Sequence, residues 1–178
     1  DAGALYWVKD LNTFVGVVDF NTDSNYTARW STNVANDRLS DSNRSFGGYS
    51  ILNLDNGYAT NDLLISSPFA DVNGKANVGS LILIRDFNTD SGVVDISNSS
   101  NYTVQFSGEF SNDSLGDSYY SGKGVQVVNV DGNAYVNDVL LSSSHATPGV
   151  PSLGSVHVLL DVDQKSGPLD LAHGGNYF

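Results

Sequence analysis

Two loops of the chain concentrate side chains that carry oxygen, and these side chains suit a metal ion. The first loop reads Asn53-Leu-Asp55-Asn-Gly57-Tyr-Ala-Thr-Asn61-Asp62, and the second reads Asn129-Val-Asp131-Gly-Asn133-Ala-Tyr-Val-Asn137-Asp138. Oxygen-bearing groups at alternate positions can converge on one point, and a later carboxylate can close the shell, which suits the hard cation calcium. The same residue types also form Asx turns, in which Asn and Asp bind their own backbone and hold no ion. The residues alone leave both alternatives open.

The elements that position these loops recur along the chain with a step of 76 and then 75 residues. Gly3-Ala-Leu-Tyr-Trp-Val returns as Gly79-Ser-Leu-Ile-Leu-Ile and again as Gly154-Ser-Val-His-Val-Leu. About 25 of the 60 positions from 3 to 62 match the position one step later. The chain, 1–178, is therefore one repeat array, in which repeat 1 spans 3–78, repeat 2 spans 79–153 and a partial repeat 3 spans 154–178.

Each period predicts four β-strands separated by turns. The first strand, such as Gly79 to Ile84, is apolar on both alternating faces, which is typical of a central strand covered on both sides. The second run includes Tyr102 and reaches Phe106; its alternation predicts an outer strand with one wet face. The third strand enters the Asx-rich loop, and the fourth leaves it at Asp62.

A small four-stranded sheet cannot bury both of its faces alone, and stacking such sheets face to face is the usual solution. We therefore expect an all-β fold built from four-stranded antiparallel blades of a β-propeller type. The chain holds about two and a third such repeats, whereas propellers usually have about four to eight blades. We expect that this chain alone does not close a ring.

The order of these segments resembles the FG-GAP repeat of the integrin alpha-chain β-propeller. The resemblance rests on Ser45-Phe-Gly47, an apolar strand, the Asx-rich loop, Asp62-Leu-Leu-Ile-Ser-Ser-Pro68 and Gly79-Ser-Leu-Ile-Leu-Ile, and it covers nearly the whole chain. It implies that each loop holds calcium on the underside of a propeller. The ligands that it implies are Asn53, Asp55, Gly57, Asn61 and Asp62 in the first copy, and Asn129, Asp131, Asn133, Asn137 and Asp138 in the second. The chain departs from the family pattern in starting each loop with Asn and in placing the closing Asp one residue late.

The remaining polar clusters favour structural roles. Asp86-Phe-Asn88-Thr-Asp90 opens like a calcium loop, but its counterparts that begin at Asp10 and Asp161 lack the third ligand, so we expect hairpin turns between adjacent strands. The histidines His145, His157 and His173 share no close spacing, so neither a zinc pair nor a Ser/His/Asp set is indicated. His157 takes the place of Tyr6 and Ile82 in the other copies, which favours a packed position.

Two further patterns recur in polar stretches. The carboxylate pair Asp37 with Asp41, matched by Asp113 with Asp117, lies in Ser-rich sequence that predicts a solvated loop, not a glycosidase pair. Sequons for N-glycosylation place weak candidate sites at Asn25, Asn43, Asn98, Asn101 and Asn112. Such sequons arise by chance in a chain rich in Asn and Ser, and they matter only where the source glycosylates them.

Composition excludes several function classes. The 178 residues include 20 acidic and 8 basic side chains, a net charge of −12, which disfavours nucleic acid and anionic lipid as partners. The apolar runs are too short to span a bilayer, so we expect no membrane insertion. With no cysteine there is no disulfide framework and no Cys-ligated zinc. The hydrophobic fraction of 40% nevertheless predicts a folded core.

Function follows from these patterns as two alternatives. The first is a non-catalytic, extracellular or cell-surface module that binds calcium and a protein partner in adhesion or protein recognition, because no nucleophile, base or closed metal shell is evident. The second is a structural subunit whose copies assemble head to tail through open blade edges into a ring, filament or surface layer, because unpaired edges are templates for pairing. A larger propeller of which this chain is a part is the other way to pair those edges.

Overall fold

The computed structural model describes residues 2–40, 48–54, 61–117, 124–132, 138–143 and 154–172. Within these ranges the fold is all-β, as expected, with strands in three sheets and helical structure limited to short 3₁₀ turns. The turns are η1 (Leu11–Thr13), η2 (Asp23–Asn25), η3 (Phe87–Thr89), η4 (Ser99–Asn101) and η5 (Val162–Gln164). Within the same ranges, no helix is long and apolar enough to cross a membrane.

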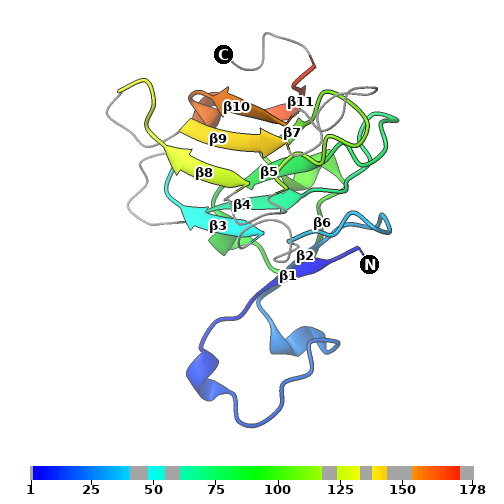
Figure 1. Cartoon of the computed structure of the whole chain (residues 1–178). Helices are drawn as coiled ribbons and strands as arrows, with labels where there is room; N and C mark the ends of the chain where they lie inside the picture. Colours follow the sequence, from blue (N-terminus) through cyan, green and yellow to red (C-terminus); the bar gives the residue numbers. More distant parts are fainter. Residues whose placement is uncertain are drawn as a thin grey trace.

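The three sheets lie one above the other (Figure 1). The N-terminal sheet has the order β1 (Ala4–Trp7), β2 (Ala28–Ser31) and β6 (Gly92–Asp95). The middle sheet has the order β11 (Gly167–Asp170), β7 (Val104–Ser107), β5 (Ser80–Ile84), β4 (Asp62–Ser67) and β3 (Tyr49–Leu52). The C-terminal sheet has the order β10 (Ser155–Leu159), β9 (Asp138–Ser143) and β8 (Val125–Val128). None of these three sheets closes on itself in the part of the chain that the structure describes.

Two hydrophobic clusters hold the stack together, one on each face of the middle sheet. Because side chains alternate along a strand, Leu63 and Ile65 of β4 point to the N-terminal sheet while Leu64 points to the C-terminal sheet. The first cluster contains Ala28, Trp30, Leu39, Leu63, Ile65, Ile82, Ile84, Phe87 and Ile96. The second contains Leu54, Leu64, Leu81, Leu83, Val104, Phe106, Leu115, Val139, Leu141, Leu159, Val162 and Leu171. The middle sheet is therefore the centre of the fold.

The prediction that the first strand of each period is covered on both faces is correct only for the middle sheet. All five residues of β5 are buried, whereas β1 is half-buried throughout and Val156 of β10 is 69% exposed. The outer sheets each have one face that no described sheet covers, which accounts for this difference.

The expected hairpins after β5 and β10 are wrong, whereas β1 does pair antiparallel with the next strand, β2, across the long segment between them. The chain turns at Asp86, whose backbone is left-handed (φ 51°), passes through η3 and leaves the middle sheet, so that β5 and β6 do not pair. Instead β6 runs parallel to β2 of the N-terminal sheet, and β11 likewise runs parallel to β7 of the middle sheet. This crossing buries Phe87 and Ile96 between two sheets, which a local hairpin would leave in solvent.

The second run of the second repeat is consequently two strands. In the second repeat β6 and β7 replace the single run expected to reach Phe106. The described outer strands β2 and β7 are also not edges, since β6 and β11 pair with them. The other predicted strands are confirmed within one or two residues of their expected ends.

Candidate metal centre

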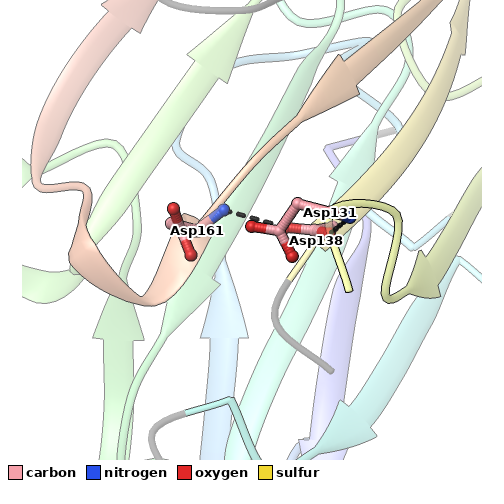
Figure 2. A group of neighbouring side chains, drawn as sticks. All are labelled: Asp131, Asp138 and Asp161. Carbon is pink, nitrogen blue, oxygen red and sulfur yellow. Dashed lines mark hydrogen bonds between the residues drawn. The ribbon is translucent and has the colours of Figure 1, made fainter. Parts of the chain in front are cut away.

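Three aspartates meet at one end of the C-terminal sheet. Asp131 follows β8, Asp138 is the first residue of β9, and Asp161 follows β10. Both strand pairs are antiparallel, with Val128 opposite Asp138 and Leu159 opposite Val139, so these three strand ends lie side by side. One carboxylate oxygen of each residue lies within 4.8 Å of those of the other two (Figure 2).

Asp138 organises the centre by binding backbone amides. Its carboxylate is fully buried; Oδ2 accepts hydrogen bonds from the Val130 N–H at 2.7 Å and the Asp131 N–H at 3.4 Å, and Oδ1 accepts one from the Asp161 N–H at 3.0 Å. Burial on its own raises the pKa of Asp138, but the three N–H donors outweigh burial and hold its pKa below the usual value. Asp138 is therefore a carboxylate at neutral pH, and it fixes the two segments that carry its neighbours.

The other two carboxylates make the centre accessible and negative. Asp131 is exposed and Asp161 is half-buried. Three carboxylates this close repel one another, and a cation between them offsets that repulsion. Carboxylate oxygens are hard ligands, which calcium accepts in irregular geometry with water or carbonyl oxygens completing the shell. The arrangement can hold a metal ion.

The middle sheet contains the same scaffold around Asp62, the first residue of β4. The Asp62 carboxylate is fully buried and accepts the Leu54 N–H at 2.6 Å on Oδ2 and the Asp86 N–H at 3.4 Å on Oδ1. Asp86 in turn accepts a hydrogen bond from the side-chain amide of Asn61. The counterpart of Asp131 in this copy, Asp55, lies outside the described residues.

The predicted ligands differ in where the structure places them. Asp131 and Asp138 lie together as expected, whereas the Oδ1 atom of Asn129 accepts a hydrogen bond from the Gly132 N–H at 2.7 Å within its own loop. In the first loop, Asn61 and Asp62 lie beside Asp86, and Asn53 is half-buried. The predicted ligands Asp55, Gly57, Asn133 and Asn137 lie outside the described residues.

Sequence reasoning missed Asp161, which it assigned to a hairpin turn. The signal was nevertheless available, because Asp10, Asp86 and Asp161 recur directly after the first strand of every period. With β9 antiparallel to β10, the residue after β10 must lie next to the start of β9. The aspartate that closes one strand and the aspartate that opens its neighbour are therefore brought together by topology.

The recurring carboxylates that were expected in a solvated loop are buried instead. Asp37, Asp113 and Asp117 are each no more than 5% exposed, and Asp41 lies outside the described residues. Asp113 is held in place because its Oδ2 accepts the N–H groups of Glu109 and Phe110, at 2.8 Å and 2.7 Å. Its carbonyl also accepts the Ser143 hydroxyl of β9, as the carbonyl of Asp37 accepts that of Ser67 of β4. Each of these turns is thus hydrogen-bonded to the fourth strand of its period, a contact that the polar sequence did not indicate.

Burial also sets the charge of two further groups. It raises the pKa of Asp37 to about 6, against the hydrogen bonds from Thr32 and the Asp71 N–H that lower it. His157 is buried in a packed position, as predicted, and burial lowers its pKa although the charges of Glu109 and Asp113 act in the opposite direction. His145 and His173 lie outside the described residues.

The described sequon asparagines have structural hydrogen bonds. The side-chain amides of Asn25 and Asn101 donate to the carbonyls of Asp19 and Asp95, at 2.7 Å and 2.8 Å, in the same place of two repeats. Asn98 accepts the Ser100 N–H, and Asn112 accepts the side-chain amide of Asn77. Asn43 lies outside the described residues.

No protein-family model, curated protein or solved structure matches the chain.

Proposed function

We propose that this chain is a non-catalytic, calcium-binding β-repeat module that acts in adhesion or protein recognition outside the cell or at its surface. The observation that carries the metal part is the convergence of Asp131, Asp138 and Asp161 at one end of the C-terminal sheet. The FG-GAP resemblance supports the same reading, since it implies calcium in the loop that contains two of these residues. A stack of sheets with an acidic surface suits a neutral or basic protein partner.

Calcium is the preferred ion because every candidate ligand is a hard oxygen donor and the loops are irregular. Magnesium demands near-ideal octahedral geometry and gives up its water reluctantly, which a partly exposed loop does not favour. Extracellular calcium modules bind with dissociation constants of about 0.1–1 mM. At 10 mM calcium such a site adds about 1.4–2.7 kcal/mol to the free energy of unfolding.

Calorimetric titration of the chain with calcium, together with thermal melts in calcium and in EGTA, tests this function. We expect saturable heat and a melting temperature that falls in EGTA. The variant with Asp131→Asn and Asp161→Asn should lose both effects. The matched control is Asp10→Asn, which changes the exposed counterpart of Asp161 in the N-terminal sheet. Absence of heat and of a melting shift in the unchanged chain contradicts the metal proposal.

A second candidate function, a subunit that assembles with copies of itself, is favoured by a separate observation. Large apolar side chains are exposed on sheet faces, including Val156 of β10 at 69% and Ile51 of β3 at 51%. Tyr49, also exposed, lies beside Ile51 on the same face of β3, and neighbouring exposed apolar side chains on one sheet face are typical of interfaces. How two copies would fit together follows from the strand order.

A further inference from the structure

The two outer sheets are incomplete versions of the middle sheet. The middle sheet runs β3-β4-β5-β7-β11, and the repeat makes β8-β9-β10 equivalent to its first three strands. The same repeat makes β1-β2-β6 equivalent to its last three strands, β5-β7-β11. Among the described strands, the C-terminal sheet therefore has no equivalents of β2 and β6, and the N-terminal sheet has none of β8 and β9. The strand type of β5 is the one that both described sheets contain, as β10 and as β1.

Exposed apolar residues mark the places of the missing strands. Val125 and Val127 of β8 pack against the middle sheet, but their counterparts on β3, Tyr49 and Ile51, are 47% and 51% exposed. They are exposed because the described N-terminal sheet has no counterpart of β3 and β4 to cover them. Val156 is exposed because no described sheet covers the outer face of the C-terminal sheet. Its counterpart Leu81 in β5 is buried, since the C-terminal sheet covers the equivalent face of the middle sheet.

The segment that follows strand β1 is more exposed than its counterparts in the other repeats. Leu11 is 70% exposed and Val17 fully exposed, whereas the counterparts of Leu11, Phe87 and Val162, are buried between sheets. The sequence Gly-Val-Val-Asp forms strand β6 at 92–95, but the identical sequence at 16–19 forms no strand. In Figure 1 the segment between β1 and β2 projects away from the sheets. Strand β1 itself has a four-residue ladder to β2, and its Leu5 and Trp7 pack against the first hydrophobic cluster, with Trp7 edge-on to Phe87. Its Tyr6 stacks on Phe20 of the projecting segment.

We propose that a second copy of this chain docks by strand exchange, in which β10 of one copy replaces β1 beside β2 of the next. The resulting sheet has the order β8-β9-β10 from one copy followed by β2-β6 from the other, which reproduces the middle sheet strand for strand. Its register is given by the β5–β7 and β1–β2 ladders, where Ser80 faces Ser107 and Ala4 faces Ser31. In the exchanged sheet Ser155 therefore faces Ser31 of the next copy, and His157 faces Arg29.

The exchange covers the exposed apolar residues on both sides. Val156 takes the place of Leu5 against the core of the next copy, and β8 and β9 cover its Tyr49 and Ile51. Each copy keeps one donor end and one acceptor end, so the contact is head to tail and yields a ring or a filament. This inference rests on the second proposed function, self-assembly, and specifies that copies exchange one defined strand. It does not depend on calcium.

Cysteine crosslinking tests the exchange, because the natural chain has no cysteine. In the variant with Ser31→Cys and Ser155→Cys, the two thiols of one copy lie in different outer sheets with the middle sheet between them, so they cannot join within a copy. Oxidation should produce a ladder of disulfide-linked dimers and larger species on a non-reducing gel. The positive control, Ser80→Cys with Ser107→Cys, pairs the equivalent positions inside the middle sheet and should give only crosslinked monomer.

A second variant, Ala4→Cys with Ser31→Cys, locks β1 onto β2 and should keep the chain monomeric. Sedimentation velocity of the natural chain at rising concentration should show association that this locked variant lacks, in EGTA as in calcium. A ladder that forms while calcium titration gives no heat would leave the exchange standing and remove the metal proposal. A natural chain that stays monomeric, or a Ser31→Cys, Ser155→Cys variant that stays monomeric while the positive control closes, overturns the exchange.

Discussion

The substitution Asp138→Asn isolates what one buried carboxylate contributes to the C-terminal sheet. The change keeps the size of the side chain, so it opens no cavity. Asp138 serves two short hydrogen bonds, from Val130 N–H at 2.7 Å and Asp161 N–H at 3.0 Å, and one oxygen faces each donor. The asparagine supplies only one acceptor and turns its NH₂ toward the other donor.

The size of the effect follows from these contacts. A buried donor left without an acceptor costs about 1–3 kcal/mol, and replacing a charged acceptor by a neutral one weakens the remaining bond by about 0.5–1.5 kcal/mol. The long contact to the Asp131 N–H at 3.4 Å adds little. We expect Asp138→Asn to lower the free energy of unfolding by about 2–4 kcal/mol, a large share of the stability of an ordinary domain.

Urea unfolding at pH 7 in EGTA measures this effect without a contribution from metal. The control Asp10→Asn changes an exposed aspartate whose left-handed backbone (φ 54°) asparagine also tolerates, so its effect should stay below about 0.5 kcal/mol. Acid adds a second check: the folded pKa of Asp138 is lowered, so its contribution is lost as the pH falls below the usual value of 3.8. The difference between natural chain and variant should shrink there. A loss below about 0.5 kcal/mol, or one that acid does not change, refutes this reasoning.

Four other substitutions have defined outcomes. Asp37→Asn should stabilise the fold at pH 7 by up to about 3 kcal/mol. The reason is that the folded pKa of Asp37, about 6, exceeds the usual 3.8, so ionisation of Asp37 lowers the stability as the pH rises from 3.8 to 6. Urea unfolding should therefore show that the gain vanishes below pH 3.8. We expect the natural chain to lose melting temperature as the pH falls below 6.5, since burial lowers the pKa of His157 and protonation favours the unfolded state. His157→Ile should reduce this loss. Gly79→Ala should cost more than about 4 kcal/mol, because its φ is +76° and the new Cβ would lie 2.2 Å from Leu115 N. Gly92→Ala, at φ +68° with open space, should cost only about 1–2 kcal/mol, and equal losses at the two glycines would contradict the packing argument.

The strands were predictable from sequence because their pattern is local. Period-two alternation and the repeat located β3, β4 and β5 closely. The partner of a strand is not local. Nothing in the sequence of Gly92–Asp95 indicates that this segment leaves the sheet of β5 and pairs with β2. Nor does it indicate that the identical sequence at 16–19 forms no strand. Stacking of whole sheets decides that choice, since it determines which apolar residues find a covered place.

The candidate site shows the same division. Asp131 and Asp138 belong to one loop, so their spacing was enough to bring them together. Asp161 comes from a different strand, and its place depends on the register between β9 and β10. Asp37 was expected in solvent because its surroundings are polar in sequence, whereas the turn around it packs against β4. The predictions from sequence failed where residues of another strand or sheet surround the side chain.

Anomalous diffraction from crystals soaked in terbium, which substitutes for calcium, tests the metal proposal most directly. We predict an anomalous peak between Asp131 and Asp161, with carboxylate oxygens about 2.3–2.6 Å from the ion. Crystals of the Asp131→Asn, Asp161→Asn variant should lack that peak. A well-ordered C-terminal sheet with no peak at this end, or with terbium bound only elsewhere, would contradict the assignment of calcium to these three aspartates.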